Sequence, residues 1–116
     1  MKAIRRRFTI KKREQARRFV MGRINFFNQF YNFKINRVAI KNTSTRWGSC
    51  SSKRNLNFNY KIIYLRRELS DYLIVHELCH LGQLNHSKKF WELVKQTIPN
   101  YVKINKELKR TPVKII

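Results

Sequence analysis

Three histidines and one glutamate are the residues of this sequence whose types and spacing are best suited to chemistry. Residues 76–80 form an H-E-x-x-H sequence in which Glu77 follows His76 directly and precedes His80 by three residues. In a helix, side chains four residues apart differ in direction by about 40°, so both imidazoles leave one face and can reach one tetrahedral metal ion. Glu77 leaves at about 100° from His76, beside the metal, where a general base for a metal-bound water must stand.

A third histidine completes the predicted set of metal ligands. His86 lies six residues beyond His80, and Gly82 between them allows the chain to turn after the helix and bring His86 back toward the metal. Three histidines and one water form the open coordination of a catalytic zinc ion. We therefore predict one zinc ion per chain, bound by His76, His80 and His86, with Glu77 as the catalytic base.

The surroundings of the motif favour this hypothesis over a purely structural one. Apart from the motif itself, residues 72–81 are almost entirely apolar. Burying two imidazoles and a carboxylate in such a helix costs free energy unless a partner satisfies them, as a zinc ion and its water would. The alternative is that His76 and His80 are core histidines bonded to the backbone and that His86 only precedes a helix. Cys79 is predicted to be a small buried apolar residue rather than a ligand.

The elements that must position these residues follow from the periodicity of the apolar side chains. Apolar residues at three- and four-residue intervals predict helices, and alternating apolar residues predict strands. Ser87 can cap one of the helices and Pro99 can end it. The patterns predict helices over about 10–31, 66–81, 87–98 and 102–110, strands over about 35–40 and 56–62, a turn over 42–45 and a polar hairpin connection over 51–55. This order indicates an α+β fold with a small sheet. The first helix should bury Ala16, Val20, Ile24, Phe27 and Tyr31.

Length and composition limit the architecture further. The 116 residues, 42% of them hydrophobic, are enough for one domain with a core and too few for two. We expect a single domain over residues 1–116, with residues 1–9 as a basic flexible arm. No stretch approaches the roughly 20 apolar residues of a membrane span. Two cysteines in a chain without a signal peptide indicate a reducing compartment, so we expect a cytoplasmic protein, and we expect it to be a monomer.

The charge of the chain predicts polyanionic partners. Lysine and arginine number 27 against 6 acidic residues, which gives a net charge of +21. Nine of the basic residues lie among the first eighteen positions. A field of this strength attracts nucleic acid, nucleotides or an anionic surface, although charge alone does not choose among them.

Three segments of the sequence resemble those of a known family. R-W-G-S-C at 46–50, H-E-L-C-H-L at 76–81 and N-H-S-K-K-F-W at 85–91 are similar to motifs of the YgjP-like metallopeptidases, which are related to the SprT-like and WLM zincins and to the minigluzincins. The resemblance implies a compact zincin core with a backing helix, a small antiparallel-rich sheet, an H-E-x-x-H active-site helix and C-terminal helices. It also implies that His76, His80 and His86 bind zinc, that Glu77 is the base, and that the R-W-G-S-C segment lies near the active site.

The same resemblance gives roles to two residues of the R-W-G-S-C segment. Trp47 is expected to serve packing. Arg46 is expected to contact either the substrate or a carboxylate, since arginine often forms ion pairs.

Several functions remain open at this point. The leading hypothesis is a zinc metallopeptidase that acts on a peptide or protein substrate. A second is a zinc-dependent nucleotide phosphohydrolase in which Lys53, Arg54 or Lys88 holds the phosphates. A third is a basic nucleic-acid-binding domain with a structural zinc, although a structural site normally has four protein ligands. A fourth is a protease that is recruited to nucleic acid through its basic N-terminal region.

Overall fold

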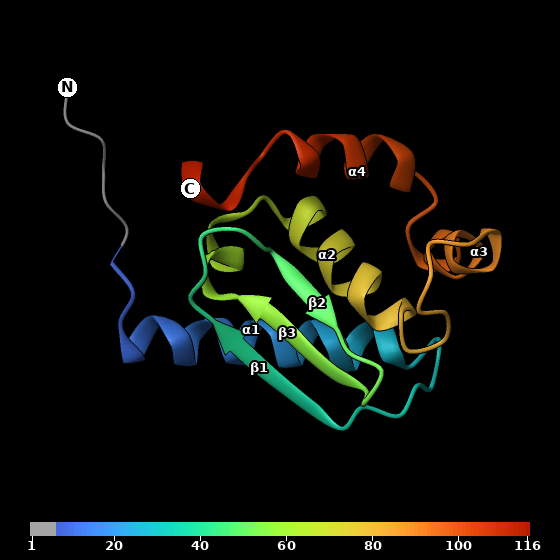
Figure 1. The fold of residues 1–116 in the computed structure, drawn as a ribbon, viewed down its shortest axis with the longest axis horizontal. Coiled ribbons are helices and arrows are strands. Elements are labelled where there is room, and N and C mark those ends of the chain that lie inside the picture. The colour runs from blue at the N-terminus through green and yellow to red at the C-terminus, as the bar shows by residue number, and fades with distance from the viewer. Residues whose placement is uncertain (1–6) are drawn as a thin grey trace.

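The computed structural model describes residues 7–116, and these form an α+β arrangement of four α-helices and one three-stranded sheet (Figure 1). The predicted fold class is therefore confirmed. Two short 3-10 helices, Tyr60–Tyr64 and Val113–Ile115, connect or follow the larger elements. These larger elements are α1 (Ile10–Asn28), β1 (Arg37–Lys41), β2 (Gly48–Cys50), β3 (Asn55–Asn59), α2 (Arg67–Cys79), α3 (Lys88–Thr97) and α4 (Tyr101–Lys109).

Helix α1 begins at a capping residue and packs one apolar stripe against the rest of the molecule. The side chain of Thr9 accepts a hydrogen bond from the backbone nitrogen of Lys12 at 3.1 Å, which satisfies one of the free N–H groups of the first turn. The helix ends at Asn28, so Tyr31 lies beyond it, where its hydroxyl donates to the carbonyl of Leu93 at 2.6 Å. The buried residues of the helix are those that the periodicity predicted: Ala16, Val20, Ile24 and Phe27.

The sheet has the order β1-β3-β2, with β3 parallel to β1 and antiparallel to β2. The longer pairing is thus parallel, whereas the sequence led us to expect a mostly antiparallel sheet. The reason is that β2 comes between β1 and β3 in sequence but pairs with the edge of β3 that faces away from β1. The chain therefore enters β3 in the same direction as β1. This topology places Gly48 opposite Phe58 and Cys50 opposite Leu56. The last three residues of the R-W-G-S-C segment therefore form a strand that the sequence patterns did not predict.

The strand predicted over residues 56–62 is only partly a strand. Leu56, Phe58, Tyr60 and Ile62 are all buried, so the alternating pattern correctly marks residues of the core. However, β3 ends at Asn59, and the last two of these residues belong to a 3-10 helix. Alternation in the sequence marked side chains that face the core, but it did not show that the strand gives way to a 3-10 helix, in which Tyr60 and Ile62 are both buried.

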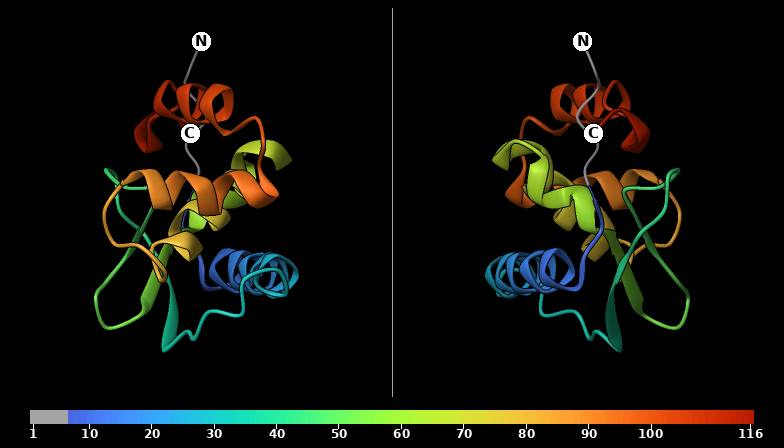
Figure 2. Two further views of the ribbon diagram at one scale, coloured as in Figure 1. Left: turned by 90° about the vertical axis from the view of Figure 1, so that its right-hand side faces the viewer. Right: turned by 90° about the vertical axis from the view of Figure 1, so that its left-hand side faces the viewer.

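Helix α2 is the central element, because it contacts α1, β2, α3 and α4 (Figure 2). It is buried on nearly all sides, as the continuous apolar run predicted. A bidentate ion pair links it to α1, with the Arg23 guanidinium 2.8 and 3.0 Å from the two carboxylate oxygens of Asp71. Bidentate pairs of this kind fix orientation as well as adding energy. The helix that carries the H-E-x-x-H sequence is therefore held from several directions.

The C-terminal part of the chain closes over α2 from the other side. Helix α3 begins at Ser87, whose hydroxyl accepts a hydrogen bond from the backbone nitrogen of Phe90 at 3.3 Å, as predicted for this cap. After α4, the indole nitrogen of Trp47 donates to the carbonyl of Thr111 at 2.6 Å. Trp47 thus ties the start of β2 to the last residues of the chain, in keeping with the packing role expected for it.

Two expectations about the whole chain concern its ends and its relation to membranes. The basic arm predicted over residues 1–9 lies mostly outside the described residues; within them, the Phe8 ring packs against Tyr60 with centroids 4.8 Å apart. Among residues 7–116 no helix has the length and apolarity required to span a membrane.

Candidate active site

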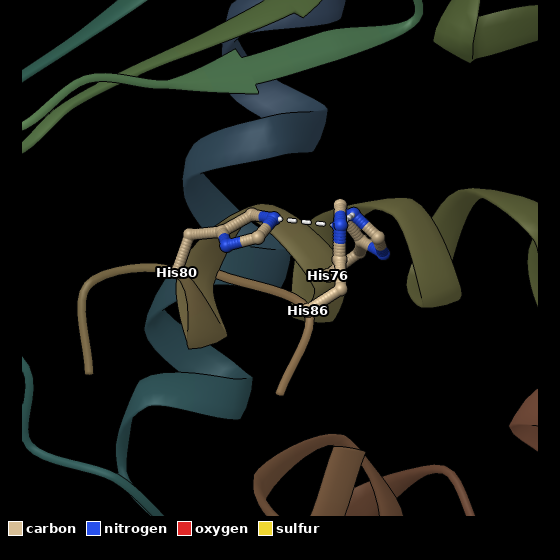
Figure 3. A group of neighbouring side chains, drawn as sticks. All are labelled: His76, His80 and His86. Carbon is tan, nitrogen blue, oxygen red and sulfur yellow. Dashed lines mark hydrogen bonds between the residues drawn. The ribbon is translucent and has the colours of Figure 1, made fainter. Parts of the chain in front are cut away.

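The structure brings the three histidines of the sequence together at one point (Figure 3). His76 lies in the last turn of α2, and His80 is the residue that caps the helix, still with helical dihedral angles. His86 lies in the loop just before α3. One nitrogen from each ring lies within 4.8 Å of those of the other two. The expected geometry, with two imidazoles on one helix face and a third returning from a loop, is therefore present.

Two of the three rings are oriented by hydrogen bonds at their Nδ1 atoms. Nδ1 of His76 lies 3.1 Å from the Tyr72 hydroxyl, and Nδ1 of His80 lies 3.0 Å from the carbonyl oxygen of Gln83. A carbonyl only accepts, so His80 carries its proton on Nδ1. Nε2 of His80 therefore carries no proton and directs its lone pair toward Nε2 of His86, 3.1 Å away. The same kind of outer partner at Nδ1 is found for histidines in metal sites generally.

The spacing of the Nε2 atoms fits a zinc ion. Nε2 of His86 lies 3.1 Å from Nε2 of His80 and 3.2 Å from Nε2 of His76. Two nitrogens bound to zinc at about 2.0–2.1 Å in tetrahedral geometry are about 3.3 Å apart. Burial also favours the neutral imidazole that binds metals, because it lowers the pKa of His76 to about 3, helped by the nearby His80 and His86. The donor set therefore suits a small divalent cation.

Two aromatic rings of α3 pack against the three imidazoles. The fully buried Phe90 contacts all of them, with its centroid 5.1 Å from that of His76, 4.4 Å from that of His80 and 5.0 Å from that of His86. Trp91 stacks on His86 at 5.8 Å with planes 23° apart. Hydrogen bonds thus orient the imidazoles of His76 and His80, while stacking on the first turn of α3 orients that of His86.

The turn that returns His86 to the site depends on Gly82 for a different reason than the sequence indicated. None of the described glycines has a positive φ, so Gly82 adopts no conformation reserved for glycine. A Cβ atom at this position would instead lie 2.8 Å from a ring carbon of Phe33 and 3.1 Å from a methyl carbon of Leu93. The absence of a side chain, rather than backbone freedom, is what lets the chain pass between these residues.

Glu77 lies one residue beyond His76 and points toward the start of β2. Its side chain is buried, and this burial raises the pKa of the carboxyl group to about 8, although the positive charge of Arg46 acts in the opposite direction. Glu77 is not one of the residues whose ligand atoms cluster with the histidine nitrogens. Its carboxyl group therefore lies beside the histidine cluster rather than in it.

Gly48 provides the space that Glu77 occupies. A Cβ atom at position 48 would lie 3.1 Å from Cγ and 3.3 Å from Oε2 of Glu77, and 3.0 Å from the carbonyl oxygen of Asn57. Strand β2 and helix α2 can therefore approach closely only because residue 48 has no side chain. The Glu77 carboxylate therefore occupies space that a larger residue at position 48 would fill.

A cleft of about 280 Å³ opens beside these groups. Arg46 is exposed at its rim, and within residues 7–116 it forms no ion pair with a carboxylate. Its charge acts on Glu77 without direct pairing. The residues that line the cleft are Arg46, Trp47, Gly48, Tyr72, Leu73, His76, Glu77, Asn105 and Leu108.

Sequence reasoning missed several residues of the site. Tyr72 precedes His76 by four residues and so shares its helix face, a signal that was available in the spacing. Asn105 approaches from α4, and no local pattern connects it with the motif. Gly48 approaches from β2; it belongs to the R-W-G-S-C segment that the family resemblance placed near the active site, but its close approach to Glu77 was not predicted. Cys79, which the sequence excluded as a ligand, is fully buried, and burial raises the pKa of its thiol to about 12.

Comparison with known families places the chain in one of them. Residues 1–111 match the family described as "YgjP-like, metallopeptidase domain". The fold and the family together define the class of the protein as a metallopeptidase. The chain belongs to the YgjP-like family, as the three sequence motifs indicated.

Two solved structures share the fold. The metallopeptidase zymogen abylysin of Pyrococcus abyssi matches with a TM-score of 0.70 and 19% identity, over 79% of this chain and 93% of that one. The metallopeptidase zymogen jannalysin of Methanocaldococcus jannaschii matches with a TM-score of 0.66 and 24% identity, over 79% and 95% of the two chains. A comparison with curated proteins gave no match.

Proposed function

We propose that this metallopeptidase is a zinc enzyme with one metal ion per chain, held by His76, His80 and His86. The observation that carries the proposal is the convergence of three Nε2 atoms, two pairs of which are 3.1 and 3.2 Å apart. Nitrogen ligands in tetrahedral geometry are typical of zinc. Zinc at this position would supply a Lewis acid that polarises a peptide carbonyl and lowers the pKa of water.

Glu77 is the residue that we propose as the general base. Its carboxylate accepts a proton from the water that attacks the scissile carbonyl, and the same carboxyl group then delivers that proton to the leaving amine nitrogen. Burial raises the pKa of this carboxyl group above that of a free glutamate, which makes it a stronger base for the first transfer. The absence of a side chain at Gly48 leaves room for the carboxylate beside the cleft.

Arg46 is proposed to contact the substrate. The guanidinium stands at the rim of the cleft, and the described residues offer it no carboxylate partner other than the more distant charge of Glu77. A guanidinium in this position can donate hydrogen bonds to a backbone carbonyl of a bound peptide.

Metal removal tests this function directly. Purified protein is incubated with an unfolded protein substrate before and after treatment with a chelator, and zinc is then restored. We expect hydrolysis to disappear on chelation and to return with zinc. A parallel assay with nucleoside triphosphates should show no metal-dependent turnover. Hydrolysis of triphosphates but not of the unfolded protein would favour the phosphohydrolase hypothesis instead.

Recruitment to nucleic acid is a second proposal, which rests on the basic surface of α1. Lys11, Arg17 and Arg18 are exposed on this helix, and none of them forms an ion pair within residues 7–116. Unpaired exposed cations release counterions from a phosphate backbone, so affinity for an oligonucleotide should fall steeply with salt.

Fluorescence anisotropy of a labelled single-stranded oligonucleotide checks this second proposal. We expect the affinity to drop at least about 10-fold between roughly 50 and 200 mM salt, and to weaken further in the Lys11→Glu/Arg18→Glu variant. Binding that does not respond to salt or to these substitutions would remove α1 from consideration as a nucleic-acid surface.

A further inference from the structure

Two consecutive hydrogen bonds between side chains link α4 to His76. Tyr72 lies one helical turn before His76, and its hydroxyl oxygen is 3.1 Å from Nδ1 of His76. The same oxygen is 2.9 Å from Oδ1 of Asn105, which α4 contributes. Tyr72 is almost fully buried, so this hydroxyl meets partners from the protein.

The chemistry of these groups sets the direction of each hydrogen bond. Oδ1 of an asparagine only accepts, so the single proton of the Tyr72 hydroxyl is donated to Asn105. The phenolic oxygen is then left with lone pairs alone toward the imidazole, and it accepts a hydrogen bond from the Nδ1–H group of His76. As a result, Nε2 of His76 carries no proton and presents its lone pair toward Nε2 of His86, 3.2 Å away.

We propose that Tyr72 and Asn105 are positioning residues that select the metal-binding tautomer of His76. The inference rests on the proposed function, in which His76 is a ligand, and extends it to two residues outside the ligand set. Helix α4 thereby takes part in preparing the metal site, although it contributes no ligand.

His76 and His80 differ in how firmly their tautomers are set. His80 faces the carbonyl of Gln83, which can only accept, so its tautomer is fixed by the backbone. The partner of His76 is a hydroxyl, which can donate as well as accept. Only Asn105 keeps the hydroxyl turned away from the imidazole. Without an acceptor at position 105, the phenol proton can turn to Nδ1, and the imidazole proton then moves to Nε2, where it blocks metal binding.

The expected change of the His76 tautomer distinguishes the proposal from a merely structural role for Tyr72 and Asn105. Tyr72→Phe removes the hydroxyl and should leave His76 with a mixture of tautomers. Asn105→Leu preserves size but removes the acceptor, and should shift His76 toward the Nε2–H form. Asn105→Asp keeps an acceptor at this position and should therefore keep the tautomer of the wild type. If Asn105 served packing alone, Asn105→Leu and Asn105→Asp, which both keep its approximate size, would have similar effects on the tautomer and on zinc affinity.

The experiment combines two measurements on each full-length variant. The tautomer of His76 is read in the metal-free protein by correlating the ring nitrogens of isotope-labelled histidine with the ring protons. The affinity for zinc is read by competition with a chelator at neutral pH. Tyr31→Phe is the matched control, because it removes another tyrosine hydroxyl, whose partners are Leu93, Thr97 and Cys79 rather than a histidine.

We expect Tyr72→Phe and Asn105→Leu to bind zinc about 10- to 100-fold more weakly than the wild type, which is the usual cost of losing an outer partner of a ligating histidine. Asn105→Asp and Tyr31→Phe should bind as the wild type does. An unchanged affinity and tautomer in both Tyr72→Phe and Asn105→Leu would overturn the proposal, as would an Nε2–H tautomer in the wild type. Failure of the wild type to bind zinc would instead contradict the proposed function, while the tautomer of the metal-free protein would still decide the role of Tyr72.

Discussion

Glu77→Gln is expected to lower the rate of peptide hydrolysis by at least about 100-fold while leaving the metal content unchanged. The amide has the shape of the carboxyl group but cannot accept the proton of the attacking water. The three imidazoles converge without Glu77, so the substitution should not disturb the metal. Initial rates on an unfolded protein substrate and metal per chain, measured on the same preparation, check both parts of this prediction.

Glu92→Gln is the matched control for this variant. It makes the same chemical change at an exposed glutamate on α3, outside the cleft. Its rate should equal that of the wild type. A Glu77→Gln protein that hydrolyses substrate at the wild-type rate would refute the role of Glu77 as the base, and one that loses its metal would mean that Glu77 supports the ligands instead.

Gly48→Ala is expected to lower kcat by about 10-fold with little change in KM, because even a small misplacement of a catalytic group lowers the rate. The added methyl group would lie 3.1 Å from Cγ and 3.3 Å from Oε2 of Glu77, so the carboxylate must move. The histidines do not touch this position, and metal content should remain that of the wild type.

Ser49→Ala separates this effect from a general disturbance of β2. Ser49 is the next residue of the strand, and its side chain turns to the other face of the sheet, where it bonds to Asn57. We expect Ser49→Ala to keep nearly full activity. Equal losses in Gly48→Ala and Ser49→Ala would show that the strand as a whole, rather than the contact with Glu77, governs the rate.

The clustering of the three histidines was predictable because local rules govern most of it. The angle between residues four apart on a helix places His76 and His80 on one face, and Ser87 marks the start of the helix whose first turn supports His86. The apolar stripe of α1 follows from the same periodicity. These features need no knowledge of what packs against them.

The parts that sequence patterns did not predict depend on contacts between distant segments. Strand β2 is only three residues long, and its pairing with β3 brings Gly48 to Glu77 across 29 positions of sequence. Asn105 reaches Tyr72 only because α4 folds back over α2. Parallel pairing of β1 with β3 likewise arises from the order of strands in space, which alternation of apolar residues does not encode.

The central claim is that these three histidines bind one zinc ion, and elemental analysis of natively purified protein tests it most directly. The wild type should contain about one zinc per chain, and the His76→Ala/His80→Ala variant should contain none. Absence of zinc from both proteins, even after reconstitution, would contradict the account and reduce the histidine cluster to packing.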